Sequence, residues 1–222
     1  MTRAHFLRAM LIPTAIALGS VPALAEPLAG RVDIRVREGT TAAQAVVYAE
    51  LIAGASPARP ASVTITQKNK AFLPRVLGLP LGATIEFPNA DAIFHNVFSL
   101  SPPQPFDLGL YRAGASKSRI FTAPAAYHVF CNIHPEMAAF IVVAPSPWVT
   151  TAAADGTWRL DVPTGLYRLT ALSERASPVT IETRAGVVDV RLALDESVTA
   201  TGPRLNKFGK PYPKEAYKTD GR

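Results

Sequence analysis

The sequence predicts an all-β protein with two sandwich-like units in tandem, and three observations point to this class. Of the 222 residues, 48% are hydrophobic and 18% are charged, while 20 prolines and 14 glycines interrupt the chain frequently. Short apolar stretches alternate with these turn signals at the spacing of antiparallel sandwiches. No helical period persists along the chain, so a helical bundle is not expected.

The first unit is expected over residues 26–145, where strand-like stretches are bounded by proline, glycine and polar residues. The predicted strands cover residues 32–36, 45–52, 62–66, 84–87, 118–121, 127–131 and 140–143. Residues 40–51 also allow one helical turn that leads into a strand. The cluster of predicted strands favours a single antiparallel sandwich.

A second β pattern covers residues 146–200. Asp155-Gly156 predicts a hairpin turn, and strands are expected at residues 158–162, 166–173, 178–183 and 187–194. A block of about 50 residues is small for independent folding, so we expect a small second sandwich that leans on the first. It contains no histidine, cysteine or methionine. We therefore expect no site chemistry there, and we expect Trp148 and Trp158 to anchor the core or the interdomain contact.

Residues 1–25 have the pattern of a secretory signal. Arg3 and Arg8 precede an apolar run, and residues 23–25 offer an A-x-A-like cleavage site, so the mature chain is expected to start at Glu26. A membrane anchor is the alternative, but an uncharged run of about 17 residues is short for a span that needs about 20. We expect export to an oxidising compartment, with no transmembrane span after cleavage.

The basic balance of the chain belongs to its C-terminal end. The formal net charge is +6, but residues 26–202 carry 15 charges of each sign. The excess beyond the signal lies in Arg204, Lys207, Lys210, Lys214, Lys218 and Arg222. A neutral body without a basic, aromatic-rich stripe argues against nucleic acid as a partner. Residues 201–222 are expected to form a flexible, solvated tail, with docking to an acidic partner or membrane surface as the alternative.

Four potential metal ligands stand out because the chain beyond the signal has only three histidines, one cysteine and one methionine. They are His95, Cys131, His134 and Met137. Two imidazoles, one thiolate and a weak thioether form the donor set of the trigonal blue-copper site, in which Met137 would be axial. Two residues after a strand-end cysteine allow His134 to fold back toward the same ion, and His95 enters from a separate connection. Taken singly, each residue could instead be an ordinary buried side chain.

Other site chemistry has little support. His128 lies three residues before Cys131 on an alternating strand, so it should point to the opposite face. A single cysteine excludes an internal disulfide and a cysteine-only zinc cluster. An oxidase or nitrite reductase needs a second site rich in histidine, and no Ser/His/Asp arrangement is visible, so no catalytic residue is assigned and an enzyme is not expected.

These motifs resemble the small blue copper proteins, or cupredoxins, especially the plastocyanin, pseudoazurin and amicyanin branch. The resemblance covers residues 30–144 and rests on Phe72-Leu73-Pro74, residues 82–91 (GATIEFPNAD), residues 95–99 (HNVFS) and residues 131–137 (CNIHPEM). It implies a Greek-key β-sandwich with one type 1 copper. It also implies that Asn96 hydrogen-bonds near the cysteine sulfur and ties the two ligand loops together. Residues 124–127 and Ala139 depart from the family, which usually has glycines at these places.

The second unit resembles the small carboxypeptidase-regulatory or transthyretin-like β module, through residues 155–158 (DGTW) and 162–167 (VPTGLY). Some periplasmic proteins grouped as plastocyanin-like or methylamine-utilisation-like join these two modules. The resemblance therefore implies a periplasmic one-electron carrier that cycles between Cu(I) and Cu(II). Its partner would be a c-type cytochrome or a periplasmic dehydrogenase.

Two further expectations concern the copper site. Copper delivery is the alternative function, although a thiolate ligand and a single methionine favour a closed site, and zinc would bind the same donors. Electrons are expected to pass through His134. An apolar docking rim would come from Pro135, Ala138 and Ala139, with Pro102-Pro103 as a further contributor.

Overall fold

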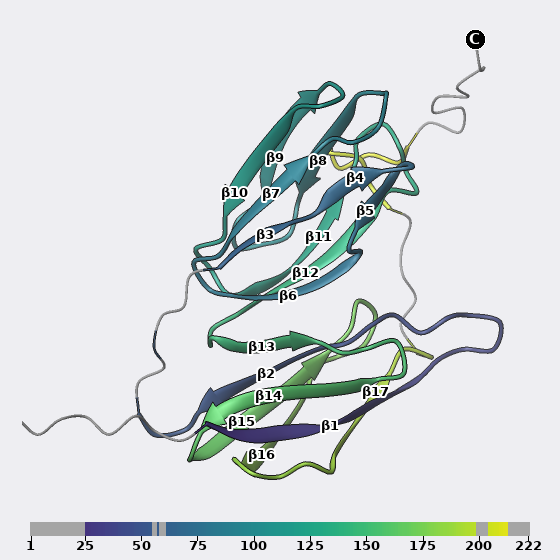
Figure 1. Ribbon diagram of the computed structural model, residues 1–222. Coiled ribbons are helices and arrows are strands. Elements are labelled where there is room, and N and C mark those ends of the chain that lie inside the picture. The colour runs from purple at the N-terminus through teal and green to yellow at the C-terminus, as the bar shows by residue number, and fades with distance from the viewer. Residues whose placement is uncertain (1–24, 55–56, 58–60, 199–203, 213–222) are drawn as a thin grey trace, which may run out of the picture.

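The computed structural model describes residues 25–54, 57, 61–198 and 204–212, and the regular structure in these residues consists of β-strands. Figure 1 shows the strands arranged as two sandwiches, one above the other. The all-β prediction is confirmed. Among the described residues, none forms a helix suited to crossing a bilayer. The expected signal lies outside the described residues except for Ala25.

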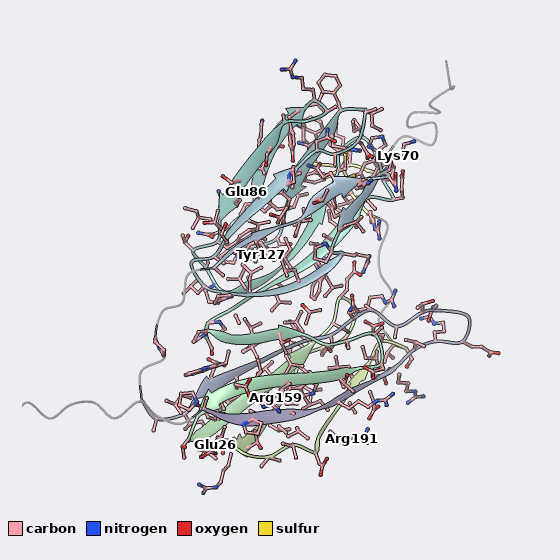
Figure 2. All side chains as sticks on the ribbon, in the orientation of Figure 1. Glu26, Lys70, Glu86, Tyr127, Arg159 and Arg191 are labelled. Atoms are coloured by element: carbon pink, nitrogen blue, oxygen red, sulfur yellow. The ribbon has the colours of Figure 1, made fainter. Side chains whose placement is uncertain are left out.

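The first sandwich packs a five-stranded sheet against a three-stranded one. The larger sheet has the order β6 (Val76–Pro80), β12 (Ala138–Ala144), β11 (Ala125–Phe130), β8 (His95–Ser99) and β9 (Phe106–Tyr111). The smaller has β10 (Ser116–Ile120), β7 (Thr84–Pro88) and β3 (Ser62–Thr64), and β4 (Thr66–Lys68) pairs with β5 (Ala71–Leu73). Fully buried aromatic side chains, including Phe87, Phe121 and Tyr127, fill the space between the sheets (Figure 2).

Strand β12 is buried along its whole length because both of its faces are covered. Ile141 and Val143 belong to the core of the first sandwich, whereas Phe140 and Val142 belong to a cluster shared with the second. Val46 and Leu172 supply the other side of that shared cluster. Alternate side chains of a strand point to opposite faces, so a doubly covered strand becomes one continuous apolar run.

The second sandwich recruits the N-terminal part of the chain. Its sheets have the orders β14-β1-β17 and β13-β2-β15-β16. The strands are β1 (Ala25–Arg35), β2 (Val46–Leu51), β13 (Trp148–Thr151), β14 (Thr157–Pro163), β15 (Leu166–Leu172), β16 (Val179–Arg184) and β17 (Val190–Asp195). Figure 2 accordingly shows Glu26 on the lower sandwich, with Arg159 and Arg191, and Lys70, Glu86 and Tyr127 on the upper one.

The expected boundary at residue 26 is therefore wrong. Residues 25–51 complete the second sandwich, and the first begins at β3. Strand β1 pairs antiparallel with β14 and parallel with β17, and β2 pairs antiparallel with both β13 and β15. Without these inner strands each sheet would split, and a block of about 50 residues cannot bury two sheets by itself.

Two local expectations in this sandwich have different outcomes. Trp148 and Trp158 lie in its core, where the Trp148 ring meets Tyr167 edge to face at 5.5 Å. Asp155-Gly156 does form a turn, in which Asp155 accepts a hydrogen bond from the Thr157 amide at 3.0 Å. The turn connects β13 to β14, which lie in different sheets, so it is not a hairpin.

The C-terminal residues 204–212 lie beside the first sandwich, drawn in yellow in Figure 1. A backbone bridge pairs Leu205 with Pro211, and the Asn206 amide donates to the Lys210 carbonyl at 2.8 Å. The expectation of a wholly solvated tail is wrong for these residues, because they contact residues 130–136 and Asp107. The other residues of the expected tail lie outside the described part of the chain.

Candidate metal centre

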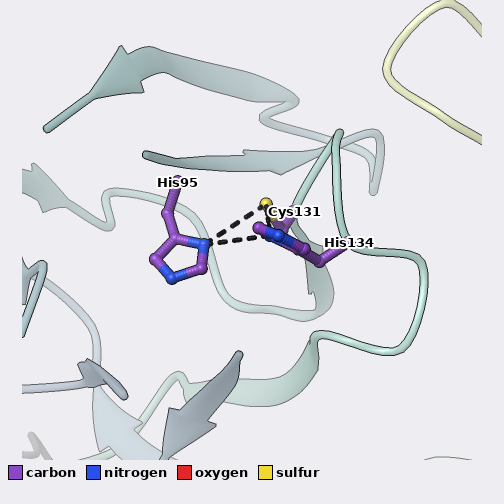
Figure 3. A group of neighbouring side chains, drawn as sticks. All are labelled: His95, Cys131 and His134. Atoms are coloured by element: carbon purple, nitrogen blue, oxygen red, sulfur yellow. Dashed lines mark hydrogen bonds between the residues drawn. The ribbon is translucent and has the colours of Figure 1, made fainter. Parts of the chain in front are cut away.

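Three of the four predicted ligands converge at one end of the first sandwich (Figure 3). His95 is the first residue of β8, Cys131 directly follows β11, and His134 lies in the next turn. Their side chains are almost wholly inaccessible, with exposed fractions of 0% for His95, 0% for Cys131 and 6% for His134. His95 was expected on a connection, whereas it begins a strand.

The three donor atoms form a triangle. The two Nδ1 atoms of His95 and His134 are 3.1 Å apart, and the Cys131 Sγ lies 3.6 Å from His134 Nδ1 and 3.9 Å from His95 Nδ1. Trigonal ligands at bond lengths of about 2.0 Å for nitrogen and about 2.3 Å for sulfur would be about 3.5 Å (N to N) and about 3.7 Å (N to S) apart. The triangle therefore has the size that a single first-row metal ion requires, and its donors suit copper or zinc.

Met137 closes the ligand loop. The Cys131 amide donates to the Met137 carbonyl at 3.2 Å, and the Met137 amide donates to the His134 carbonyl at 3.0 Å. The Met137 side chain is fully buried in the same core cluster as Cys131. The loop is thus a compact turn with Met137 beside Cys131, and axial ligation by the thioether stays a prediction.

Asp91 orients the His95 ring, a role that the sequence did not predict. Its Oδ2 lies 2.7 Å from His95 Nε2, which directs Nδ1 of the same ring toward Cys131. The carboxylate also accepts the amides of Asn69 at 2.6 Å and Lys70 at 2.9 Å. Burial alone would raise the pKa of Asp91, but the hydrogen bonds from Lys70, His95 and Asn69 outweigh it and lower the pKa. The carboxylate therefore stays ionised and favours the tautomer with a proton on Nε2.

Asn89 builds the loop that leads to His95. Its amide nitrogen donates to the carbonyls of Ile93 at 2.8 Å and Tyr111 at 3.2 Å, and its Oδ1 accepts the Asp91 amide at 3.0 Å. The side chain is buried, with 2% exposure. In the sequence both residues belong to the Asn-Ala-Asp turn that ends the motif of residues 82–91, and neither was assigned a role toward His95.

The Cys131 sulfur sits among backbone donors. The Asn96 amide points at Sγ from 3.5 Å, and the amides of Ile133 and His134 also favour the thiolate. Burial nevertheless raises the pKa of the thiol above its ordinary value. The metal-free protein therefore holds a neutral thiol, and binding a metal to the thiolate releases its proton.

The His134 imidazole is neutral for a similar reason. Burial lowers the pKa of His134, and the nearby His95 lowers it further. An unprotonated ring nitrogen is the form that binds a metal.

The side chain of Asn96 differs from expectation. Its Nδ2 donates to Asp107 Oδ1 at 2.7 Å, on the neighbouring strand β9, and does not tie the two ligand loops. The backbone amide of Asn96 makes the contact with the sulfur instead. Asp107 had no recognisable signal in the sequence, because only the pairing of β8 with β9 brings it next to Asn96.

Comparisons with solved structures found proteins that are similar to part of this chain. No protein-family model matches this chain, and no curated protein matches its sequence. A copper-containing nitrite reductase from Thermus scotoductus SA-01 is 31% identical over 42% of this chain, with a TM-score of 0.36. This chain spans 25% of that reductase chain.

Two smaller proteins match along nearly their whole length. A purple cupredoxin from Nitrosopumilus maritimus is 23% identical over 38% of this chain and 99% of its own, with a TM-score of 0.34. A reduced amicyanin carrying the P94F substitution is 20% identical over 43% of this chain and 98% of its own, with a TM-score of 0.35. This chain is similar to cupredoxins. The donor geometry, rather than this likeness, supports a metal centre.

His128 lies apart from the triangle, as the strand alternation predicts. Its ring packs 5.2 Å from Phe140 and 6.4 Å from Phe130, between centroids. Burial lowers the pKa of His128, so the neutral ring is favoured.

The expected docking rim is wrong in part. Ala138 and Ala139 are only 6% and 1% exposed, because they begin the doubly covered strand β12. Pro102-Pro103 follow Ser101, whose Oγ accepts the amide of His128, three residues before Cys131. Their place beyond that contact puts them along the strand and away from the ligands.

Proposed function

We propose that this protein is an exported type 1 copper protein that carries single electrons in the periplasm. One observation carries the proposal, namely the buried triangle of two imidazole nitrogens and one cysteine sulfur at 3.1–3.9 Å. Copper would supply a one-electron Cu(II)/Cu(I) couple there. His95, Cys131 and His134 would hold it, with Met137 as a weaker fourth ligand.

The surroundings of the ligands suit electron transfer, because each ligand is held before any metal arrives. Asp91 fixes the His95 ring, backbone amides surround the Cys131 sulfur, and backbone hydrogen bonds close the loop from Cys131 to Met137. Ligands that are held this way rearrange little when the metal changes its charge. Small rearrangement lowers the barrier to electron transfer.

The partner surface of this carrier would include the edge of the site. His134 is the most exposed of the three donors, at 6%, and electrons would therefore pass through its ring. Phe94, next to His95 in the chain, is 53% exposed, and replaces the buried alanines as an apolar contact. A small apolar surface suits the brief encounters of a redox partner, such as a c-type cytochrome or a periplasmic dehydrogenase.

Burial also separates this proposal from copper delivery. A delivery site must exchange its metal, whereas the donors here lie at 0–6% exposure behind a hydrogen-bonded loop. Slow release of copper to a strong chelator would support the carrier, and release within seconds would favour delivery.

The direct test is the visible spectrum of the purified protein after addition of Cu(II). We expect an intense thiolate-to-copper band at roughly 600 nm that ascorbate bleaches. The band should disappear in Cys131→Ser and persist in His128→Ala, the matched histidine outside the triangle. A fully copper-loaded protein without the band would show that Cys131 is not a ligand and would overturn the proposal.

A further inference from the structure

The C-terminal segment 204–212 follows the loop that carries Cys131 and His134. Arg204 Nη1 donates to the carbonyls of Pro135 at 3.0 Å and Glu136 at 3.2 Å. Further along the segment, the Lys207 amide donates to Asn132 Oδ1 at 3.0 Å. These contacts hold the loop close to its beginning, at Asn132, and toward its far end, at Pro135 and Glu136.

Tyr212 holds the beginning of the loop. Its hydroxyl donates to the carbonyl of Cys131 at 2.7 Å. The segment therefore contacts the backbone of one ligand itself. Arg204 adds a contact before the loop, with its guanidinium 5.8 Å from the Phe130 ring centroid.

A second path connects the same segment to the cysteine sulfur. Lys207 Nζ pairs with Asp107 Oδ2 at 2.8 Å, and Asp107 Oδ1 accepts the Asn96 side-chain amide at 2.7 Å. The backbone amide of Asn96 points at Cys131 Sγ from 3.5 Å. Lys207 thus touches the ligand loop through its backbone and the strand opposite the sulfur through its ammonium group.

Apolar burial does not explain why the segment lies here. None of its residues belongs to the three apolar core clusters, and its large apolar side chains, Leu205 and Phe208, are 40% and 71% exposed. Its contacts with the first sandwich are hydrogen bonds, one ion pair and the approach of Arg204 to the Phe130 ring, and they concentrate on the ligand loop and on Asp107.

We propose that residues 204–212 act as a clamp that positions the metal ligands, with Tyr212 and Lys207 as its positioning residues. The clamp rests on the proposed function, since its purpose is to hold the Cys131 loop and the donor at its sulfur. It gives part of the basic C-terminal end a role inside the molecule. In metal proteins generally, hydrogen bonds to the ligands orient them and tune the metal. In this protein such contacts come from a segment that follows the second sandwich in the chain.

The first experiment needs no metal. Amide hydrogen exchange at Cys131 and Met137 reports on the loop, because both amides donate within it. In metal-free Tyr212→Phe we expect these two amides to exchange about 3- to 10-fold faster, as the loss of one hydrogen bond allows. Tyr167→Phe is the matched control, since the Tyr167 hydroxyl donates to the Pro163 carbonyl at the same 2.7 Å in the second sandwich.

The second experiment uses the copper-loaded protein. Tyr212→Phe should release copper to a chelator about 10-fold faster. Lys207→Gln should shift the reduction potential downward, because a nearby cation favours the state with the extra electron, and Lys207→Arg should restore it. A role confined to overall folding would leave the potential unchanged.

The outcomes separate the clamp from the proposed function. Unchanged exchange at Cys131 and Met137 in both Tyr212→Phe and Lys207→Gln would overturn the clamp, whatever metal the protein binds. Faster exchange in these variants, in a protein that shows no thiolate–copper band, would uphold the clamp and overturn the copper proposal.

Discussion

Replacing Asp91 with asparagine should weaken metal binding about 10-fold while leaving the fold intact. In the native protein Asp91 Oδ1 accepts the Asn69 amide, and Oδ2 accepts both the Lys70 amide and the His95 ring. Asparagine has the same shape but only one acceptor oxygen, so its amide group must face at least one of these donors. The His95 ring then loses either its acceptor or the negative charge of that acceptor.

The magnitude follows from the type of hydrogen bond. A hydrogen bond to a charged group contributes about 1.5–3 kcal/mol and one between neutral groups about 0.5–1.5 kcal/mol. Replacing the charged acceptor of His95 by a neutral one therefore costs about 1.4 kcal/mol, which lowers metal affinity by a factor of about 10. The assay is a competition titration of Cu(II) or Zn²⁺ against a chelator of known affinity. Both metals should respond, because Asp91 acts on the ring and not on the metal.

Asp155→Asn is the control for this substitution. Asp155 also accepts a backbone amide, from Thr157 at 3.0 Å, but it lies on a turn of the second sandwich. Its replacement should leave metal affinity unchanged. Equal affinities for the native protein and Asp91→Asn, within a factor of two, would refute the idea that Asp91 positions His95.

Three further predictions concern packing and protonation. Phe140→Ala should lower the free energy of unfolding by about 3–5 kcal/mol in chemical denaturation, because Phe140 fills the contact between the sandwiches; a loss below about 1 kcal/mol would contradict that packing. Gly30→Ala should lower the thermal midpoint, since a Cβ there would be 2.0 Å from the Val190 carbonyl oxygen; an unchanged midpoint would speak against the pairing of β1 with β17. In NMR titrations of the metal-free protein, His134 should have a midpoint below the ordinary pKa of 6.5. Between the two pKa values His134 is protonated in the unfolded chain but neutral in the folded one, so it lowers the free energy of unfolding as pH falls through 6.5 toward the folded pKa. A midpoint above 6.5 would contradict its burial.

The meeting of Cys131 and His134 could be predicted because potential metal ligands are scarce in this chain. Only one cysteine exists, and His134 follows it three residues later, so chain spacing alone brings the two together. His95 was recognisable by its residue type and its His-Asn-Val-Phe-Ser motif. Its position at the start of β8 was not, because all five residues of that strand are buried and show no alternation of polar and apolar residues.

The groups that contact the ligands could not be predicted from the sequence. Asp91 belongs to a recognised motif, but nothing in that motif showed that it would contact His95. Asp107 lies 11 residues from Asn96, on a strand that contains a glycine and was not predicted. The segment 204–212 was read from its charge as a solvated tail. Its contacts depend on carbonyls and side chains that come together only in the folded loop, and these cannot be predicted from the charge of the segment.

At the boundary between the two sandwiches, too, the sequence predicted the strands but not their partners. The apolar alternation of residues 32–36 and 45–52 identified both stretches as strands, but their partners are β14, β17, β13 and β15, more than 90 residues away. Either sandwich offers a strand the same kind of apolar face, so local pattern does not choose between them.

By itself, then, the sequence determined the all-β class, most of the strands and the identity of the proposed metal donors, because these depend on residue type and short spacing. Only the tertiary structure decided which sandwich each N-terminal strand completes, which carboxylate orients His95, and where residues 204–212 lie. Those outcomes depend on surfaces assembled from distant segments, and such surfaces exist only once the chain has folded.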